Sequence, residues 1–264
     1  MIAIIDYGMG NLASVAKAFR FLGGKVRITS DPKVVARAQA LVLPGVGAFG
    51  EAMAELKKRR LMNPILGSIR EDKPFLGLCL GLQLLFASSE ESPRVRGLGV
   101  LPGRVQRFRV PKGFKVPHMG WNQIKRVPLT LRQAQGERLM KWQQTVRGEP
   151  FGSAVRPEAL EGERPAQDRP VSAKSIGGSA SFCGGEPRTG SLLEGVPDGA
   201  FMYFVHSFYA QPEERKMIAA VTEYGNRFPS VVWNGRRLWA TQFHPEKSQK
   251  WGLKIVNNFI EQVA

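Results

Sequence analysis

Apolar residues follow two patterns in the first ninety residues of the chain, namely continuous runs and runs at helical spacing. Residues 1–5 form an apolar run, and residues 12–22 carry apolar side chains at helical spacing. Asn11 is placed to cap this helix, and Gly23 and Gly24 are placed to end it. Further elements expected here are strands at 25–29, 39–45 and 75–78, a helix at 49–70 interrupted near Pro64, and an apolar helix at 80–89. Strands alternating with helices predict an α/β fold, with a mostly parallel central sheet flanked by helices.

After residue 98 the pattern changes to short segments rich in valine, threonine and aromatic residues, separated by turns. Asn234 and Gly235 stand between two such segments and predict a hairpin. The expected strands are 103–110, 119–127, 201–210, 217–224, 229–234 and 237–244, followed by a helix at about 248–262. The second half therefore adds antiparallel strands to the parallel sheet.

Residues 130–190 fit neither half. Only 9 of these 61 residues are Leu, Ile, Val or Phe, which is too few for a packed core. Since the entropy of closing a loop grows slowly with its length, a surface turn tolerates such an insertion. We expect a single domain over 1–264 that contains a flexible, low-complexity insertion at 130–190.

Charge and cysteine content exclude several classes of protein. The formal net charge is +16, but Lys and Arg are scattered and no RNA-binding signature appears, so the charge indicates a surface for phosphates or an acidic protein. The two cysteines, Cys79 and Cys183, show no CxxC or Cys/His spacing, which argues against a disulfide framework or a metal site. No secretory signal or membrane-length apolar run appears, so a cytoplasmic protein is expected.

Cys79 stands between Gly77 and Gly81, where a buried strand meets an apolar helix. Glycines at these two positions permit the sharp turn of a nucleophile elbow, which lifts one side chain above the sheet. A helix N-terminus also favours the thiolate over the thiol. Cys79 is therefore the candidate nucleophile, and Cys183, inside the insertion, is not.

A cysteine nucleophile needs a base and a group that orients the base. Of the three histidines, His244 follows an apolar strand in 242-QFHPEKS-248. Residues i and i+2 of an extended segment project to one side, so Glu246 is placed to hold the His244 ring. We interpret His118 and His206 as structural, with His206 near the site but not a base.

Acyl transfer also requires donors for an oxyanion. The segment 41-LVLPGVGAF-49 runs from a strand into a glycine-rich turn, which places the Val46 N–H as one candidate donor. The N–H of Leu80, directly after Cys79, is the second.

The motifs PGVGAF, GLCLGLQ and FHPE, in this order, resemble those of the class I glutamine amidotransferases. Four blocks are further similar to the glutaminase subunits of imidazole glycerol phosphate synthases, a family within that class: 5-IDYGMGNLASV-15, 117-PHMGWN-122, 204-FVHSF-208 and 242-QFHPEKS-248. The resemblance covers about 1–128 and 192–264, and the insertion departs from it. It implies a flavodoxin-like amidotransferase fold.

The resemblance implies a mechanism without cofactor or metal. Cys79 attacks the glutamine carboxamide to form a glutamyl thioester, His244 protonates the departing ammonia and then activates water, and Glu246 orients His244. Val46 and Leu80 form the oxyanion hole, Val46 after a peptide rearrangement when a partner is engaged. The positions that match substrate-binding residues are Gly45, Gly47, Gln83 and Glu91.

The resemblance also implies a partner. Relatives dock on a (β/α)8-barrel cyclase and pass ammonia through the barrel, making imidazole glycerol phosphate and aminoimidazole carboxamide ribotide for histidine and purine synthesis. The positions that match the interface or its ammonia gate are Asn11, Trp121, Tyr203 and Lys247. Each of these also has an ordinary interpretation, as a helix cap, sheet packing or a solvated charge.

Two other functions stay open on the sequence. The chain could be the glutaminase of a different synthase, such as anthranilate, aminodeoxychorismate or pyridoxal phosphate synthase, although the PHMGWN and FVHS blocks argue against this. It could also be a catalytically silent scaffold whose insertion blocks docking or disorders the site.

Overall fold

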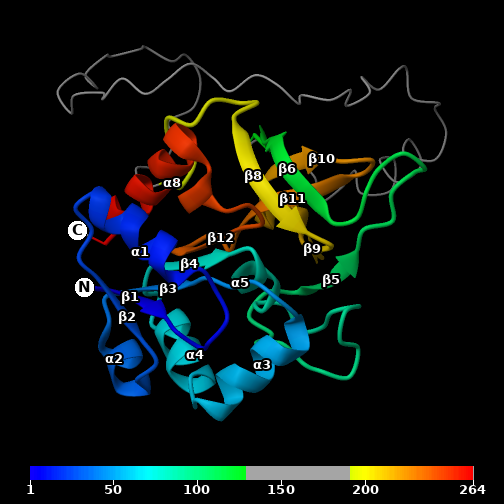
Figure 1. Cartoon of the computed structure of the whole chain (residues 1–264). Coiled ribbons are helices and arrows are strands. Elements are labelled where there is room, and N and C mark those ends of the chain that lie inside the picture. Colours follow the sequence, from blue (N-terminus) through cyan, green and yellow to red (C-terminus); the bar gives the residue numbers. More distant parts are fainter. Residues whose placement is uncertain (129–190, 264) are drawn as a thin grey trace. The chain divides into compact units, whose positions relative to one another are not determined.

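The computed structural model of the protein describes residues 1–128 and 191–263, so the expected insertion at 130–190, with Cys183, lies outside the described residues. In the described part, the largest sheet has eight strands in the order β2-β1-β3-β4-β12-β11-β10-β7 (Figure 1). Its parallel strands are β1 (Ile2–Ile5), β2 (Val26–Thr29), β3 (Ala40–Leu43), β4 (Phe75–Leu78) and β12 (Leu238–Thr241). Its antiparallel strands are β7 (Lys125–Arg126), β10 (Ile218–Glu223) and β11 (Arg227–Trp233).

Two antiparallel ribbons accompany this sheet. Strand β5 (Gly103–Arg107) pairs with β9 (Phe208–Pro212), and β6 (His118–Gln123) pairs with β8 (Phe201–His206). The predicted hairpin at Asn234 is confirmed, because β11 and β12 pair across it and Gly235 has a φ of 85°. Antiparallel strands in the second half are thus confirmed as well.

Helices cover both faces of the sheet (Figure 1). Helices α1 (Leu12–Phe21) and α8 (Gln249–Glu261) pack on the face that receives Ile2 and Ile4 of β1. Helices α2 (Pro32–Arg37), α3 (Phe49–Lys58) and α4 (Met62–Arg70) pack on the face that receives Ala3 and Ile5. Because both faces are covered, the inner parallel strands β1, β3, β4 and β12 are buried, which explains their apolar sequences, whereas the edge strand β2 is only partly buried.

The ends of several elements differ from those expected. The helix expected at 49–70 breaks at Arg60, which has a φ of 58°, and Pro64 lies inside the first turn of α4, where it needs no N–H. Helix α2 is an element that the sequence pattern did not predict; it begins with Pro32 and is capped by Asp31, whose carboxylate accepts from the Lys33 N–H at 2.8 Å. The long strand expected at 201–210 is divided at Ser207 into β8 and β9.

The expected helix at 80–89 is wrong in length. Helix α5 (Leu80–Gln83) is a single turn. The N–H groups of Leu98 and Val100 donate to the carbonyl groups of Leu84 and Leu85, each at 2.8 Å. These carbonyl groups therefore cannot serve a continuing helix, and the chain turns away after α5.

No helix in residues 1–128 and 191–263 is long and apolar enough to cross a membrane. The short 3₁₀ helices among the same residues are η2 (Arg215–Met217) and η3 (Pro245–Lys247).

Candidate active site

The candidate residues gather where three neighbouring parallel strands end. Cys79 directly follows β4, Gly45 follows β3 by two residues, and His244 follows β12 by three. Strand β4 lies between β3 and β12 in the sheet, so their carboxyl ends meet at one edge. Open α/β sheets bind their ligands at this edge.

Cys79 has the backbone of a nucleophile elbow. Its φ of 52° and ψ of −105° are sterically unfavourable for a residue with a side chain, and its N–H donates to the Thr241 carbonyl oxygen at 2.8 Å. A Cβ atom at Gly81 would lie 1.8 Å from the carbonyl oxygen of Leu43, and one at Gly77 would lie 3.0 Å from the carbonyl oxygen of Gly81. Gly81 therefore has no room for a side chain and Gly77 has little, so close backbone approach is a second reason for glycine at positions where the sequence predicted a sharp turn.

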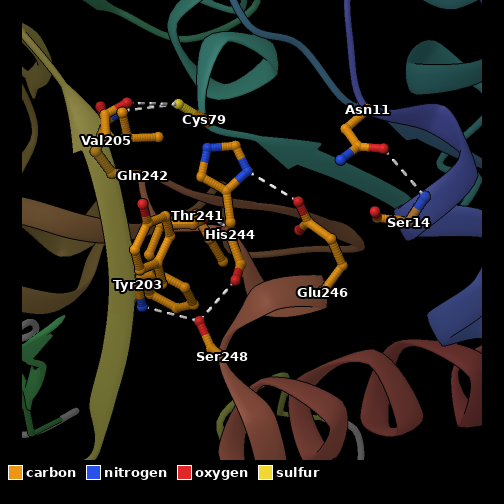
Figure 2. Close-up of polar contacts among 11 residues, drawn as sticks. Asn11, Ser14, Cys79, Tyr203, Val205, Thr241, Gln242, His244, Glu246 and Ser248 are labelled. Carbon is orange, nitrogen blue, oxygen red and sulfur yellow. Dashed lines mark hydrogen bonds and ion pairs between the residues drawn. The ribbon is translucent and has the colours of Figure 1, made fainter. Parts of the chain in front are cut away.

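His244 and Glu246 form a buried pair. The His244 Nδ1 and Glu246 Oε1 atoms are 2.9 Å apart, and the side chains are 5% and 2% exposed. The predicted pairing is present, but the backbone differs from the expected extended segment, because residues 245–247 form the 3₁₀ helix η3. Figure 2 shows the imidazole ring of His244 between Cys79 and Glu246.

The His244 ring is stabilised in its charged form. Burial by itself lowers the pKa of His244, but the neighbouring Cys79 and Glu246 raise it more, to about 10. The Nε2 atom of His244 is buried and makes no hydrogen bond within the described residues. The arrangement therefore favours an imidazolium beside the Cys79 sulfur, as in cysteine hydrolases.

A pocket of about 340 Å³ opens next to Cys79. Among its lining residues are five of the other candidates: Val46, Gly47, Leu80, Gln83 and Glu91. The pocket is also lined by residues for which the sequence predicted no contact with a ligand, namely Pro117, Val205, His206, Ser207 and Phe208. Their signals were the FVHSF block and, for Pro117, the PHMGWN block, which suggested a family but no chemistry. Gly45 lies outside the lining.

The two candidate oxyanion donors differ in this structure. The Leu80 N–H donates to the carbonyl oxygen of Gly45, at 3.3 Å, while Val46 is 41% exposed and lines the pocket. Leu80 must therefore give up a long bond before it donates to a ligand. The oxyanion role of both residues stays a prediction.

Gln83 and Glu91 are held by backbone groups near the pocket. The Gln83 amide donates to the Phe208 carbonyl oxygen at 2.9 Å and to Gln242 Oε1 at 3.3 Å. The Glu91 carboxylate accepts from the Phe49 N–H at 2.8 Å, at the start of α3, where the helix dipole favours a negative charge. Both side chains are thus fixed before any ligand binds.

Comparison with known proteins decides the family. Residues 3–263 match the protein family described as "Glutamine amidotransferase class-I". The chain belongs to the class I glutamine amidotransferases. An elbow cysteine beside a buried His–Glu pair is the arrangement that the sequence resemblance implied for this family.

Two relatives of this amidotransferase are each named "Imidazole glycerol phosphate synthase subunit HisH". The relative from Desulfitobacterium hafniense is 40% identical over 260 residues, covering 98% of this chain and 93% of the relative. The relative from Methanothermobacter thermautotrophicus is 41% identical over 261 residues, covering 99% and 98%. A crystal structure described as that of a glutamine amidotransferase is 13% identical, with a TM-score of 0.59 and coverage of 100% and 99%. That likeness shows the fold alone.

Replacing Glu246 of the amidotransferase by glutamine should lower the pKa of His244 from about 10, because the amide carries no charge. A protonated His244 stabilises the fold fully below its unfolded pKa of about 6.5, and this stability is lost as the pH rises through the folded pKa. In Glu246→Gln, the stability contributed by the protonated His244 should therefore be lost at a lower pH than in the wild type. Titration of the His244 ring by NMR measures the shift.

Glu223→Gln, which changes a surface carboxylate paired with Arg227, is the matched control and should leave the His244 titration unchanged. An unchanged His244 pKa in Glu246→Gln would contradict the pairing described here.

His118 and His206 are two buried, neutral histidines joined by a hydrogen bond. Burial lowers the pKa of His118 to about 4 and that of His206 to about 3. His206 Nδ1–H donates to the Phe208 carbonyl oxygen at 2.8 Å, so its Nε2 accepts from His118 Nδ1–H, at 3.2 Å. Neither ring is a base near neutral pH, which agrees with their structural interpretation.

Three of the four candidate interface residues form one cluster. The rings of Trp121 and Tyr203 are 5.9 Å apart, and the Lys247 Nζ atom is 5.8 Å from the centre of the Tyr203 ring. Asn11 instead caps α1, accepting from the Ser14 N–H at 3.2 Å. The β6–β8 ribbon also exposes large apolar side chains, namely Met119, Trp121 and Phe201. An exposed apolar patch of this kind is typical of an interaction surface.

Tyr7 is a buried residue at the site that sequence reasoning missed. Its side chain is fully buried, and its hydroxyl makes no hydrogen bond within the described residues. A Cβ atom at Gly45 would lie 2.1 Å from this hydroxyl, so the ring packs directly against the turn after β3. Burial, and then the charge of Cys79, raise the pKa of Tyr7 above its ordinary value.

Tyr7→Phe should raise the free energy of unfolding by about 1 kcal/mol, because it removes a buried polar group that has no partner. Urea unfolding of the wild type and the variant measures this. Tyr224→Phe is the matched control. It should lower the free energy of unfolding by about 1 kcal/mol, since the Tyr224 hydroxyl donates to the Lys115 carbonyl oxygen at 2.9 Å. Equal losses in both variants would refute the assignment of Tyr7 as unpartnered.

Proposed function

We propose that this amidotransferase is the glutaminase subunit of an imidazole glycerol phosphate synthase, and that it supplies ammonia to a cyclase subunit in histidine biosynthesis. The observation that carries the proposal is identity of about 40% over nearly the whole chain to relatives that bear the subunit's name. The pocket beside an elbow cysteine supports a hydrolytic role.

In the first half of the proposed reaction, the Cys79 thiolate attacks the carboxamide carbon of glutamine. The C–N bond breaks, a glutamyl thioester forms, and the imidazolium of His244 gives its proton to the departing ammonia. The raised pKa of His244 supports this role, because the ring holds a proton at neutral pH until the leaving group takes it.

In the second half, neutral His244 takes a proton from water as the water attacks the thioester carbon. The C–S bond breaks, glutamate leaves, and the thiolate and imidazolium are restored. Glu246 holds the ring in one orientation through both halves, and its pairing at 2.9 Å supports this.

The oxyanion of each tetrahedral intermediate is assigned to the N–H groups of Val46 and Leu80. In this proposal the carbonyl of Gly45 releases the Leu80 N–H, and the peptide of Val46 turns toward the pocket when the partner is bound. The length of the Leu80–Gly45 bond, 3.3 Å, supports the ease of the first change.

The amino-acid end of glutamine is assigned to Gln83 and Glu91, with the backbone of Gly45 and Gly47. Both amide hydrogens of Gln83 are used within the protein, which leaves its Oε1 as an acceptor for an ammonium group. Glu91 adds a carboxylate to the same pocket.

The cyclase is assigned to the β6–β8 side, where Trp121, Tyr203 and Lys247 cluster, and to Asn11. A (β/α)8-barrel partner in a cytoplasmic heterodimer would receive ammonia there and make imidazole glycerol phosphate and aminoimidazole carboxamide ribotide. The exposed apolar side chains of this ribbon support docking.

The proposal is tested by glutamine hydrolysis in three mixtures: the chain alone, the chain with a cyclase subunit, and both with the cyclase's ribonucleotide substrate. We expect slow hydrolysis by the chain alone and an increase of about 10²- to 10³-fold in the full mixture, the contribution to kcat that one oxyanion-hole donor typically makes. A rate that is the same in all three mixtures would count against a synthase subunit.

A further inference from the structure

The side-chain amide of Gln242 contacts the candidate nucleophile. Gln242 is fully buried between β12 and His244, and its Nε2 atom lies 3.8 Å from Cys79 Sγ. Figure 2 shows Gln242 next to Val205, with both residues facing the sulfur. Burying an amide costs free energy unless its hydrogen bonds are made, so a buried amide in contact with the candidate nucleophile indicates a function.

The orientation of this amide is fixed by its neighbours. The carbonyl oxygen of Phe208 is only an acceptor, so the Gln83 atom 2.9 Å from it must be the amide nitrogen. The same nitrogen then donates to Gln242 Oε1 at 3.3 Å. With its oxygen bound to Gln83, Gln242 has its Nε2 on the side of the sulfur.

The two polar contacts of the sulfur have opposite effects. The carbonyl oxygen of Val205, 3.9 Å from Cys79 Sγ, accepts from the thiol S–H and would be repelled by a thiolate. The amide N–H of Gln242 donates to the sulfur and favours the thiolate. Gln242 is thus the neutral donor that complements the charge of His244 beside the sulfur.

Other titratable groups lie around this sulfur on several elements and would shape any pH profile. They are His244 and Glu246 at η3, Tyr7 after β1, and His206 and Glu91 in the pocket wall.

We propose that Gln242 is a positioning residue, whose amide, held by Gln83, keeps the Cys79 sulfur anionic and in place for attack. The inference rests on the proposed function in one respect, that Cys79 is the nucleophile. Its effect passes through the sulfur, so losing the amide should lower kcat and leave the KM for glutamine nearly unchanged.

The test measures alkylation of Cys79 by iodoacetamide from pH 5 to 10, resolved by peptide mass spectrometry, together with glutamine turnover. The variants are Gln242→Met, which fills similar space without a donor, and Gln242→Leu, a smaller apolar side chain that also lacks a donor and keeps the proposal testable if the first does not fold. We expect the midpoint of alkylation to rise by about one pH unit and kcat to fall about tenfold, with KM within about twofold. Gln211→Met on β9 is the control and should match the wild type.

The outcomes separate the two proposals. An alkylation midpoint unchanged in a folded variant overturns the positioning role, whatever the turnover. A raised midpoint with unchanged turnover supports the contact between Gln242 and the sulfur, and counts instead against Cys79 as the nucleophile.

Discussion

Cys79→Ala is expected to lower glutamine hydrolysis by at least about 10⁴-fold, because no other atom at the elbow can form the thioester. Alanine is smaller and suits the same backbone as cysteine, so the folded structure should persist. Ammonia release in a coupled assay measures turnover, and thermal unfolding checks the fold.

Two controls accompany Cys79→Ala. Cys183→Ala should retain wild-type turnover, since Cys183 has no role in the proposed chemistry. With a cyclase and ammonia supplied directly, Cys79→Ala should still support product formation, because only the source of ammonia is lost. Glutamine turnover near the wild-type rate in Cys79→Ala would remove the basis of the mechanism.

Gly81→Ala should destabilise the protein by about 3 kcal/mol or more and lower Tm by roughly 6–12 °C. The added Cβ atom would lie 1.8 Å from the carbonyl oxygen of Leu43 in β3, a buried strand that is paired on both sides and cannot move away. Any relief of the clash shifts the elbow, so turnover should fall as well. Denaturant unfolding and glutamine assays measure the two effects.

Gly67→Ala is the matched control for this change. Gly67 lies within α4, and a Cβ atom there would meet nothing within 4 Å. Alanine in an open helical position should be neutral or stabilising by up to about 1 kcal/mol. If Gly81→Ala were as stable as Gly67→Ala, the close approach of α5 to β3 would be refuted.

Features governed by local chemistry could be predicted from the sequence. The buried parallel strands are recognisable as apolar runs, and the elbow follows from glycines two residues on either side of Cys79. The His244–Glu246 pair was also predictable, although the spacing of two residues is bridged by a 3₁₀ turn and not by extended backbone. Here the right pair was reached through the wrong local conformation.

Features governed by distant parts of the chain could not be predicted. The length of α5 is limited by amides of residues 98–100, which take the carbonyl groups a longer helix would use. Tyr7 and Gln242 reach the site because β1, β3, β4 and β12 lie side by side, an order that no local pattern encodes. The pocket wall at 205–208 depends in the same way on how β8 and β9 lie against the sheet.

The most direct measurement follows the amide nitrogen of glutamine. The chain, a cyclase and the cyclase's ribonucleotide substrate are incubated with ¹⁵N-amide glutamine and an excess of unlabelled ammonium, and the imidazole product is examined by mass spectrometry. A glutaminase that hands ammonia directly to its partner predicts that the product carries ¹⁵N. Product made from unlabelled nitrogen, with the ¹⁵N recovered as free ammonium, would contradict this account.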